Sequence, residues 1–128
     1  MQLTTNFTKQ EFECRDGSAM PSEALENVKL LAKELQVLRD FVGKNIVINS
    51  GYRSPSYNKR VGGAPKSQHL LGKAADITIT GMTPKQVAQA IEKLIAQGKM
   101  KQGGIGIYKT FTHYDIRGVK ARWDFSKK

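Results

Sequence analysis

The sequence predicts an α+β fold with a small antiparallel sheet and two main helices. Two amphipathic helix patterns are partly segregated from short β-branched segments, and the last two of these segments are separated by a tight turn, as in a hairpin. The chain has 128 residues, the usual length of one domain, so residues 1–128 are predicted to form a single domain.

The first part of the chain predicts a helical turn, a long helix and a strand. Thr8-Lys9-Gln10-Glu11 is a capping-box pattern, which indicates a short helical turn. Apolar residues at three- and four-residue steps predict a helix over residues 21–41, with Pro21 in its first turn and Gly43 as its stop. Residues 46–50 begin with three β-branched residues, Ile46, Val47 and Ile48, and predict a strand.

The middle of the chain alternates between a polar loop and a second strand. Residues 56–68 contain glycine and polar residues and predict a loop with one helical turn. Residues 74–79 predict a strand, and their alternation places Ala74, Asp76 and Thr78 on one face.

The last part of the chain predicts a second helix and a hairpin. Thr83 is a suitable N-cap for this helix and Gly98 a suitable end. Residues 104–108 and 111–116 predict two strands joined by a tight turn. No element is predicted for the tail, residues 119–128.

The charge of the chain is strongly positive and unevenly distributed. Its 21 Lys and Arg against 11 Asp and Glu give a net charge of +10. Residues 1–42 carry five basic against seven acidic residues, whereas residues 43–128 carry sixteen against four. Such a surface attracts polyanions, either nucleic acid or an anionic cell wall. Because no recognition helix is evident and aromatic residues do not alternate with the basic ones, no nucleic-acid partner is expected.

Several classes of protein are excluded by simple features. No segment approaches the roughly 20 apolar residues of a membrane helix, so membrane insertion is not expected. The N-terminus lacks a basic and apolar signal pattern, so we expect synthesis in the cytoplasm and delivery to the wall by other means, as for a phage or prophage protein. The single cysteine, Cys14, excludes an intramolecular disulfide and is expected to be a buried apolar residue. Nothing requires more than a monomer.

The two histidines of the chain each lie near an aspartate. Gly72 lets the chain turn between His69 and the strand that carries Asp76. His113 and Asp115 are two residues apart on a predicted strand, so they face the same side. If this strand lies beside residues 74–79, Asp76 and His113 can meet across the sheet.

Two imidazoles and one carboxylate are the donors of catalytic zinc, which keeps a fourth position open for water. Such a zinc makes water more acidic and polarises a carbonyl, with Asp115 as candidate general base. Arg53 is suited to stabilise an oxyanion or hold a substrate carboxylate. The spacing alone leaves other roles open for these residues. In those interpretations Asp76 only caps a turn, Asp115 only pairs with Arg117, and Arg53 is one more charge on a basic surface.

Four segments resemble a known family. They are, in chain order, Asn6-Phe7-x-x-x-Glu11-Phe12-x-Cys14, Ser50-Gly51-Tyr52-Arg53-Ser54 with Asn58, Ser67-x-His69-x-x-Gly72-x-Ala74-x-Asp76, and His113-Tyr114-Asp115. They resemble the start, the arginine segment, and the first and last zinc motifs of the small carboxypeptidase-like branch of the zinc D-Ala-D-Ala carboxypeptidase family. That family includes phage endolysins and the vancomycin-resistance D,D-dipeptidases, and hedgehog domains share its fold.

The resemblance implies a hedgehog/D,D-peptidase-like fold and a zinc-dependent peptidase that acts on peptidoglycan stem peptides. It implies zinc ligands at His69, Asp76 and His113. It also implies substrate-side residues at Arg53, Ser67 and Asn58. The bond, whether of carboxypeptidase or endopeptidase type, is not specified.

One position departs from the family pattern. Better-known members place the base carboxylate three residues before the final histidine, where this chain has Thr110. Asp115 is therefore expected to be the base and to act in catalysis together with Arg53. Two other interpretations stay open: the base lies elsewhere in the chain, or the activity is weak. The alternative is a non-catalytic wall-binding or phage structural module on the same fold.

Overall fold

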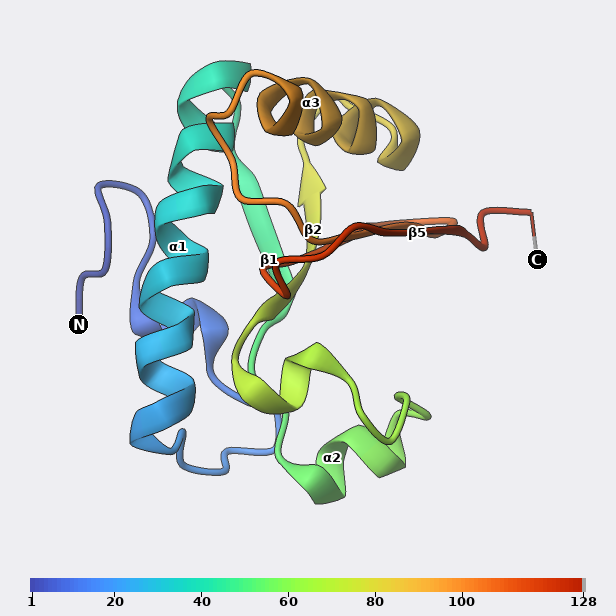
Figure 1. Ribbon diagram of the computed structural model, residues 1–128. Helices are drawn as coiled ribbons and strands as arrows, with labels where there is room; N and C mark the ends of the chain where they lie inside the picture. Colours follow the sequence, from blue (N-terminus) through green and yellow to red (C-terminus); the bar gives the residue numbers. More distant parts are fainter. Residues whose placement is uncertain (128) are drawn as a thin grey trace.

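The computed structural model describes residues 1–127, which form three α-helices, two 3-10 turns and a five-stranded sheet (Figure 1). The predicted α+β class is confirmed. In chain order the elements are η1 (Lys9–Phe12), α1 (Ser22–Val42), β1 (Ile46–Ser50), α2 (Pro55–Arg60), η2 (Gln68–Leu71), β2 (Ala74–Ile79), α3 (Pro84–Ala96), β3 (Gly104–Ile107), β4 (Thr112–Asp115) and β5 (Ala121–Asp124).

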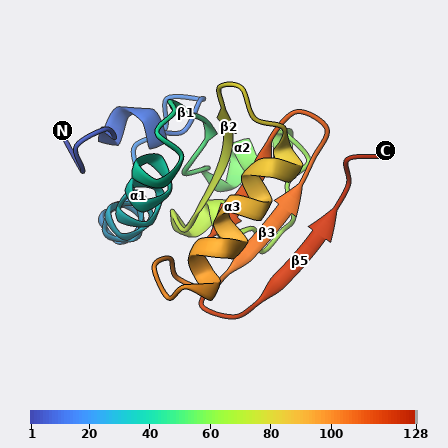
Figure 2. The same ribbon diagram turned by 90° about the horizontal axis from the view of Figure 1, so that it is seen from above.

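The strands are arranged in the order β1-β2-β4-β3-β5. The first three neighbouring pairs are antiparallel, as predicted, and β3 and β4 form the predicted hairpin. The pair β3 and β5 is parallel, so the sheet is not wholly antiparallel. Strand β5 lies in the tail for which no element was predicted, and it forms one edge of the sheet (Figure 2).

The ends of the helices follow local chemistry. Gly43 ends α1 in the left-handed conformation, with φ 64°, and its N–H donates to the carbonyl of Arg39 at 3.0 Å. Pro21 is the N-cap of α1 and not its first residue, a shift of one position. The Ser54 hydroxyl caps α2 by accepting from the N–H of Tyr57. The helix therefore begins at Pro55 and is longer than the single turn predicted there. Within the described part of the chain, no helix combines the length and apolar character of a membrane span.

The two faces of the sheet have different roles. Ala75, Ile77 and Tyr114 are fully buried in the core, where α1 and α3 contribute further apolar side chains. Because side chains alternate along a strand, Asp76 and His113 project from the opposite face. In Figure 1, α3 lies above the sheet and α2 lies below it. The fold therefore places a polar site on the face that the two long helices do not cover.

The core is built mainly from α1 and the middle of the sheet. Leu31, Leu35 and Leu38 of α1 have no exposed surface and pack in the same cluster as Ile48 and Ile77. Burial of one such side chain stabilises the fold by about 1.5–3 kcal/mol. This rigid layer fixes the positions of β2 and β4, which carry two of the candidate zinc ligands.

Candidate metal centre

Asp76 and His113 face one another across the centre of the sheet. They are paired residues in the antiparallel register of β2 and β4. Nδ1 of His113 lies 3.1 Å from Oδ1 of Asp76. The prediction that these two residues meet across neighbouring strands is confirmed. The contact follows directly from strand pairing, because opposite residues of an antiparallel pair have side chains on the same face.

His69 reaches the same point from the loop before β2. The Ser67 hydroxyl accepts from the N–H of His69 at 3.2 Å and starts η2, and Gly72 ends it with φ 74°. This glycine turns the chain into β2, as the sequence predicts. Nε2 of His69 then lies 3.2 Å from Oδ1 of Asp76.

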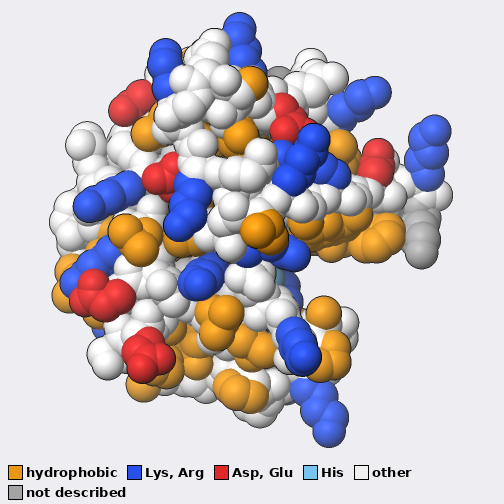
Figure 3. Space-filling model, in the orientation of Figure 1, with side chains coloured by type: hydrophobic (Ala, Val, Ile, Leu, Met, Phe, Trp, Pro, Cys, Tyr) orange, Lys and Arg blue, Asp and Glu red, His pale blue; other side chains and the backbone are white. Residues whose placement is uncertain are grey.

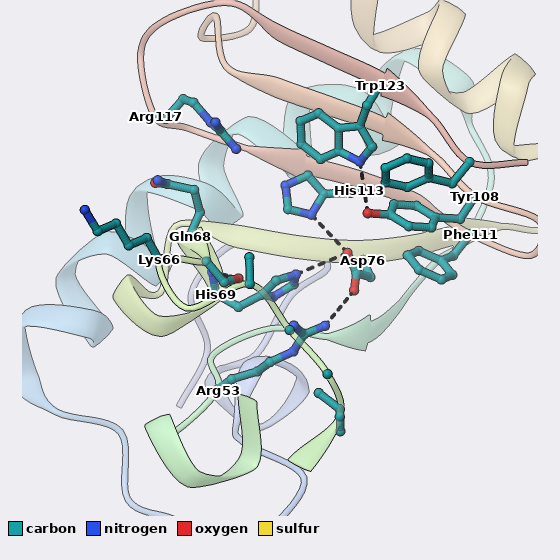
Figure 4. A pocket seen from close by; sticks show the side chains of 16 residues that line it. Arg53, Lys66, Gln68, His69, Asp76, Tyr108, Phe111, His113, Arg117 and Trp123 are labelled. Atoms are coloured by element: carbon teal, nitrogen blue, oxygen red, sulfur yellow. Dashed lines mark hydrogen bonds and ion pairs between the residues drawn. The ribbon is translucent and has the colours of Figure 1, made fainter. Parts of the chain in front are cut away.

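The three side chains form a compact buried cluster that fits a zinc ion. His69, Asp76 and His113 are 2%, 6% and 7% exposed, and one ligand atom from each lies within 4.8 Å of the others. Two imidazole nitrogens and one carboxylate oxygen are ordinary zinc donors, and they leave a fourth position open. Figure 4 shows the three side chains converging at the wall of a cleft.

The outer nitrogen of each imidazole is already bonded to the protein. Nδ1 of His69 lies 2.7 Å from the carbonyl of Gly51, and Nε2 of His113 lies 2.7 Å from Oδ2 of Asp115. These acceptors assign the ring protons to the outer nitrogens, so that the lone pairs of the inner nitrogens point at Asp76. Lone pairs and a carboxylate repel one another unless a proton or a cation lies between them. The donor set therefore suits a bound cation.

The pKa shifts of Asp76 and His113 also indicate a site that favours positive charge. When no cation is bound, protons on the inner nitrogens can take its place. Burial alone would raise the pKa of Asp76, but hydrogen bonds from His113 and His69 in that state hold it well below its usual range. Burial lowers the pKa of His113, but its hydrogen bonds to Asp115 and Asp76 outweigh burial and raise it. The same negative charge that favours a proton on His113 favours a divalent cation.

Arg53 contacts the carboxylate oxygen of Asp76 that the histidines leave free. Its Nη2 donates to Oδ2 of Asp76 at 3.1 Å, its Nε to the hydroxyl of Ser50 at 3.1 Å, and its Nη1 to Oδ1 of Asn58 at 3.2 Å. Each guanidinium nitrogen therefore has an acceptor within the protein. Arg53 does line the cleft, as a substrate-side residue must, but its observed contacts orient the Asp76 carboxylate.

Asp115 lies behind His113 rather than in the cleft. It has no exposed surface and is not among the residues that line the cavity. Oδ1 accepts from the backbone N–H of Gly104 and from Nε of Arg117, at 2.9 Å each, and Oδ2 accepts from Nη2 of Arg117 at 2.8 Å. The pairing of Asp115 with Arg117, left open by the sequence, is confirmed. These contacts differ from those of a general base, which must reach the substrate or a water.

The two other predicted substrate residues differ in position. Ser67 lines the cleft, but its hydroxyl caps η2. Asn58 is buried, with its amide oxygen on Arg53 and its amide nitrogen donating to the carbonyl of Ala64 at 2.8 Å. The contacts of Asn58 hold Arg53 and the loop after α2, and no part of Asn58 lines the cavity.

The metal cluster opens into a cleft of about 670 Å³. Figure 3 shows it as a notch between an arm, whose lower edge is hydrophobic, and a lower lobe that carries basic side chains. The arm is formed by β3, β4 and β5, and the lobe by α2 and the segment that follows it (Figure 1). The aromatic residues of the arm that line the cleft are Tyr108, Phe111, Trp123 and Phe125.

Trp123 is a residue of the site that the sequence did not predict. Its indole lies 5.0 Å from the ring of His113, and its Nε1 donates to the hydroxyl of Tyr108 at 2.9 Å. A Cβ at Gly106 would overlap this indole, so the glycine is needed for the close approach of β5. The feature of the sequence that could have indicated this contact is the pair Gly104 and Gly106. These two glycines leave one face of β3 without side chains, so that an aromatic ring can pack against the backbone.

The chain is similar to one family model, to a carboxypeptidase and to a solved structure of an endopeptidase. Residues 3–115 match the family model described as Peptidase M15. The zinc D-Ala-D-Ala carboxypeptidase of Streptomyces albus G is 37% identical over 78 residues, which cover 56% of this chain and 31% of that protein. The chain thus spans about a third of the length of that relative. The crystal structure of the Serratia marcescens L-Ala D-Glu endopeptidase ChiX aligns with a TM-score of 0.48 and 17% identity, over 76% of this chain and 88% of that one.

The family match includes every residue of the metal cluster. It begins before η1 and ends at Asp115, the last residue of β4, so that only β5 and the flanking segments lie outside it. The arrangement of histidine, aspartate and histidine described above therefore lies within the matched part, and the chain belongs to the peptidase M15 family.

Proposed function

We propose that this protein is a zinc-dependent peptidase that hydrolyses peptide bonds of bacterial peptidoglycan. The observation that carries the proposal is the convergence of His69, Asp76 and His113, each buried and each held by a second protein group. The zinc D-Ala-D-Ala carboxypeptidase named above supports the choice of metal and of substrate. The net charge of +10 suits a protein that works on an anionic wall.

In this proposal the residues of the chain divide into ligands and supports. His69, Asp76 and His113 hold the metal. Arg53 orients the second oxygen of Asp76, and Asp115 fixes the ring of His113 and strengthens it as a ligand. When bound, zinc supplies Lewis-acid chemistry, which polarises a carbonyl group and makes water more acidic.

Asp115 acts in this proposal as a positioning residue. Both of its oxygens are occupied, and its negative charge is balanced by Arg117 and shared with His113. Taking a proton from water would require breaking at least one of these contacts. We therefore assign to Asp115 the orientation of His113 in place of the general-base role that the sequence suggested.

A digestion experiment tests the function. Purified peptidoglycan is incubated with the zinc-loaded chain, with the chelated chain, and with the chelated chain after zinc is restored, and the products are identified by mass spectrometry. We expect a peptide fragment to be released in the first and third samples and not in the second, and its mass names the bond. A zinc-loaded chain that releases nothing contradicts the proposal.

A second candidate is a wall-binding module without catalysis. One observation favours it: among the described residues that line the cleft, Asp76 is the only carboxylate, and it is already engaged with Arg53 and both histidines. In that case the chain sediments with insoluble peptidoglycan in a zinc-dependent manner, but the masses of the peptidoglycan peptides stay unchanged.

A further inference from the structure

The cleft has two chemically different ends, one on each side of the metal cluster. Figure 4 shows Lys66, Gln68 and Arg117 on one side of the two histidines, and Tyr108 and Phe111 on the other. All five residues line the same cavity. A ligand long enough to extend across the metal cluster in both directions can therefore contact both ends.

The first end carries positive charge that the protein neutralises only in part, because Arg117 is paired with Asp115 and Lys66 is not paired within the described residues. Lys66 is exposed and has no hydrogen bond or ion pair with residues 1–127. Arg117 uses Nε and Nη2 for Asp115, and within the same residues its Nη1 has no acceptor. The guanidinium also lies 5.6 Å from the ring of Trp123, which fixes its orientation over the cleft. This end is therefore suited to bind an anion.

Arg53 is less available for that task. Each of its guanidinium nitrogens already donates to an acceptor on Ser50, Asn58 or Asp76, which leaves one N–H on Nη1 and one on Nη2. A carboxylate entering the cleft finds unengaged donors at Lys66 and at Nη1 of Arg117. Charged donors form stronger hydrogen bonds with carboxylates than neutral ones do.

The second end is aromatic and uncharged. The rings of Tyr108 and Phe111 stack with centroids 4.4 Å apart and planes within 11° of parallel. The Tyr108 hydroxyl accepts from Trp123, which holds this ring in place. A flat apolar surface of this kind binds methyl groups or ring faces and disfavours a desolvated charge.

We propose that Lys66 and Arg117 form a subsite for a carboxylate of the substrate, and that Tyr108 and Phe111 hold an uncharged part of it. A peptide then crosses the metal cluster in one orientation, with its free carboxylate at the basic end. The nature of the peptide, a peptidoglycan stem, rests on the proposed function. The subsite itself does not depend on turnover and is tested by binding.

The test uses calorimetric titration of the full zinc-loaded chain with two synthetic stem peptides. One peptide has free carboxylates, and in the other they are carboxamides. We expect the free acid to bind about tenfold more tightly or better, as a charge-assisted contact predicts. Lys66→Gln removes most of this difference and leaves binding of the carboxamide unchanged. Phe111→Ala weakens both peptides by the same factor.

The matched control is Lys59→Gln, which removes an exposed lysine of α2 that does not line the cleft. Equal affinity of the wild-type chain for the two peptides overturns the proposal. So does an equal loss of free-acid binding in Lys66→Gln and Lys59→Gln, which indicates general attraction to a basic surface. If the chain binds the free acid selectively but does not cleave peptidoglycan, the proposed function is wrong and the subsite is supported. If it cleaves peptidoglycan but binds both peptides equally, the subsite is wrong and the proposed function is supported.

Discussion

Nε2 of His113 lies 2.7 Å from Oδ2 of Asp115, two residues further along the same strand. The period of a strand puts both side chains on the open face of the sheet, and the contact leaves Nδ1 of His113 directed at Asp76. Arg117 and the N–H of Gly104 hold Asp115 in turn. One strand thus supplies both a metal ligand and the group that orients it.

We expect Asp115→Asn to weaken zinc binding by about 10–100-fold, because an uncharged partner no longer fixes and polarises the His113 ring. Competition with a coloured chelator measures the affinity. Asp124→Asn, at an exposed position of β5, is the control and should bind zinc as the wild type does. If Asp115→Asn keeps full zinc affinity and loses turnover, Asp115 is the base that the sequence suggested.

Gly106→Ala is expected to destabilise the fold by about 1–3 kcal/mol, because the added methyl group meets the indole of Trp123. Urea denaturation gives the free energy of unfolding. In a Trp123→Ala background the same substitution should be almost neutral, since the overlap has been removed. An equal loss in both backgrounds would show that the indole is not the neighbour that matters.

The ion pair between Glu92 of α3 and Arg122 of β5 predicts a pH dependence of stability. Both carboxylate oxygens accept from Arg122 at 2.8 Å, and this hydrogen bonding lowers the pKa of Glu92 below its usual value. The folded pKa is therefore lower than the unfolded one, about 4.3. The pair stabilises the fold above that pH, and its contribution disappears as the pH falls through the folded pKa.

We thus expect wild type to exceed Glu92→Gln in stability at pH 7 by at most about 1 kcal/mol, since the pair is partly exposed. The difference should shrink towards pH 3, as measured by urea denaturation across that range. Glu26→Gln, which breaks a more exposed pair with Lys29, serves as the reference with a smaller effect. A difference between wild type and Glu92→Gln that grows on acidification contradicts the assignment.

Leu35 and Leu30 lie on the same helix and offer a matched pair of truncations. Leu35 has no exposed surface, whereas Leu30 is 49% exposed. Leu35→Ala should lower the free energy of unfolding by about 2–5 kcal/mol and Leu30→Ala by less than about 1 kcal/mol. Thermal or urea unfolding measures both, and similar losses would mean that the apolar stripe of α1 does not face the core.

The elements that could be predicted from the sequence are those with strong local signals. Gly43 ends α1 because the left-handed conformation suits glycine, and the period of two along β2 and β4 brings Asp76 opposite His113. A tight turn between β3 and β4 fixes their antiparallel pairing. The stop at Gly43 and the hairpin depend on neighbours within a few residues. The meeting of Asp76 and His113, 37 residues apart, also requires β2 to lie beside β4, so the sequence predicted it only on that condition.

What could not be predicted depends on contacts between distant segments. Strand β5 is a short, partly buried edge strand that pairs in parallel with β3, and no local pattern indicates such a partner. The ion pair of Arg53 with Asp76 joins residues 23 positions apart and forms only when the segment after β1 lies beside β2. The pairing of Asp115 with Arg117 was one of the alternatives that the sequence left open, but the hydrogen bond from the N–H of Gly104 to Asp115 forms only once β3 lies beside β4.

The central claim is that His69, Asp76 and His113 bind zinc, and the zinc content of the purified chain tests it most directly. Elemental analysis of the wild type should find one zinc per chain, whereas His69→Ala and His113→Ala should contain almost none while keeping the circular dichroism of a folded protein. Lys59→Gln should retain its zinc. A folded wild-type chain that takes up no zinc, or a His113→Ala variant that binds it as tightly as the wild type, would contradict the account.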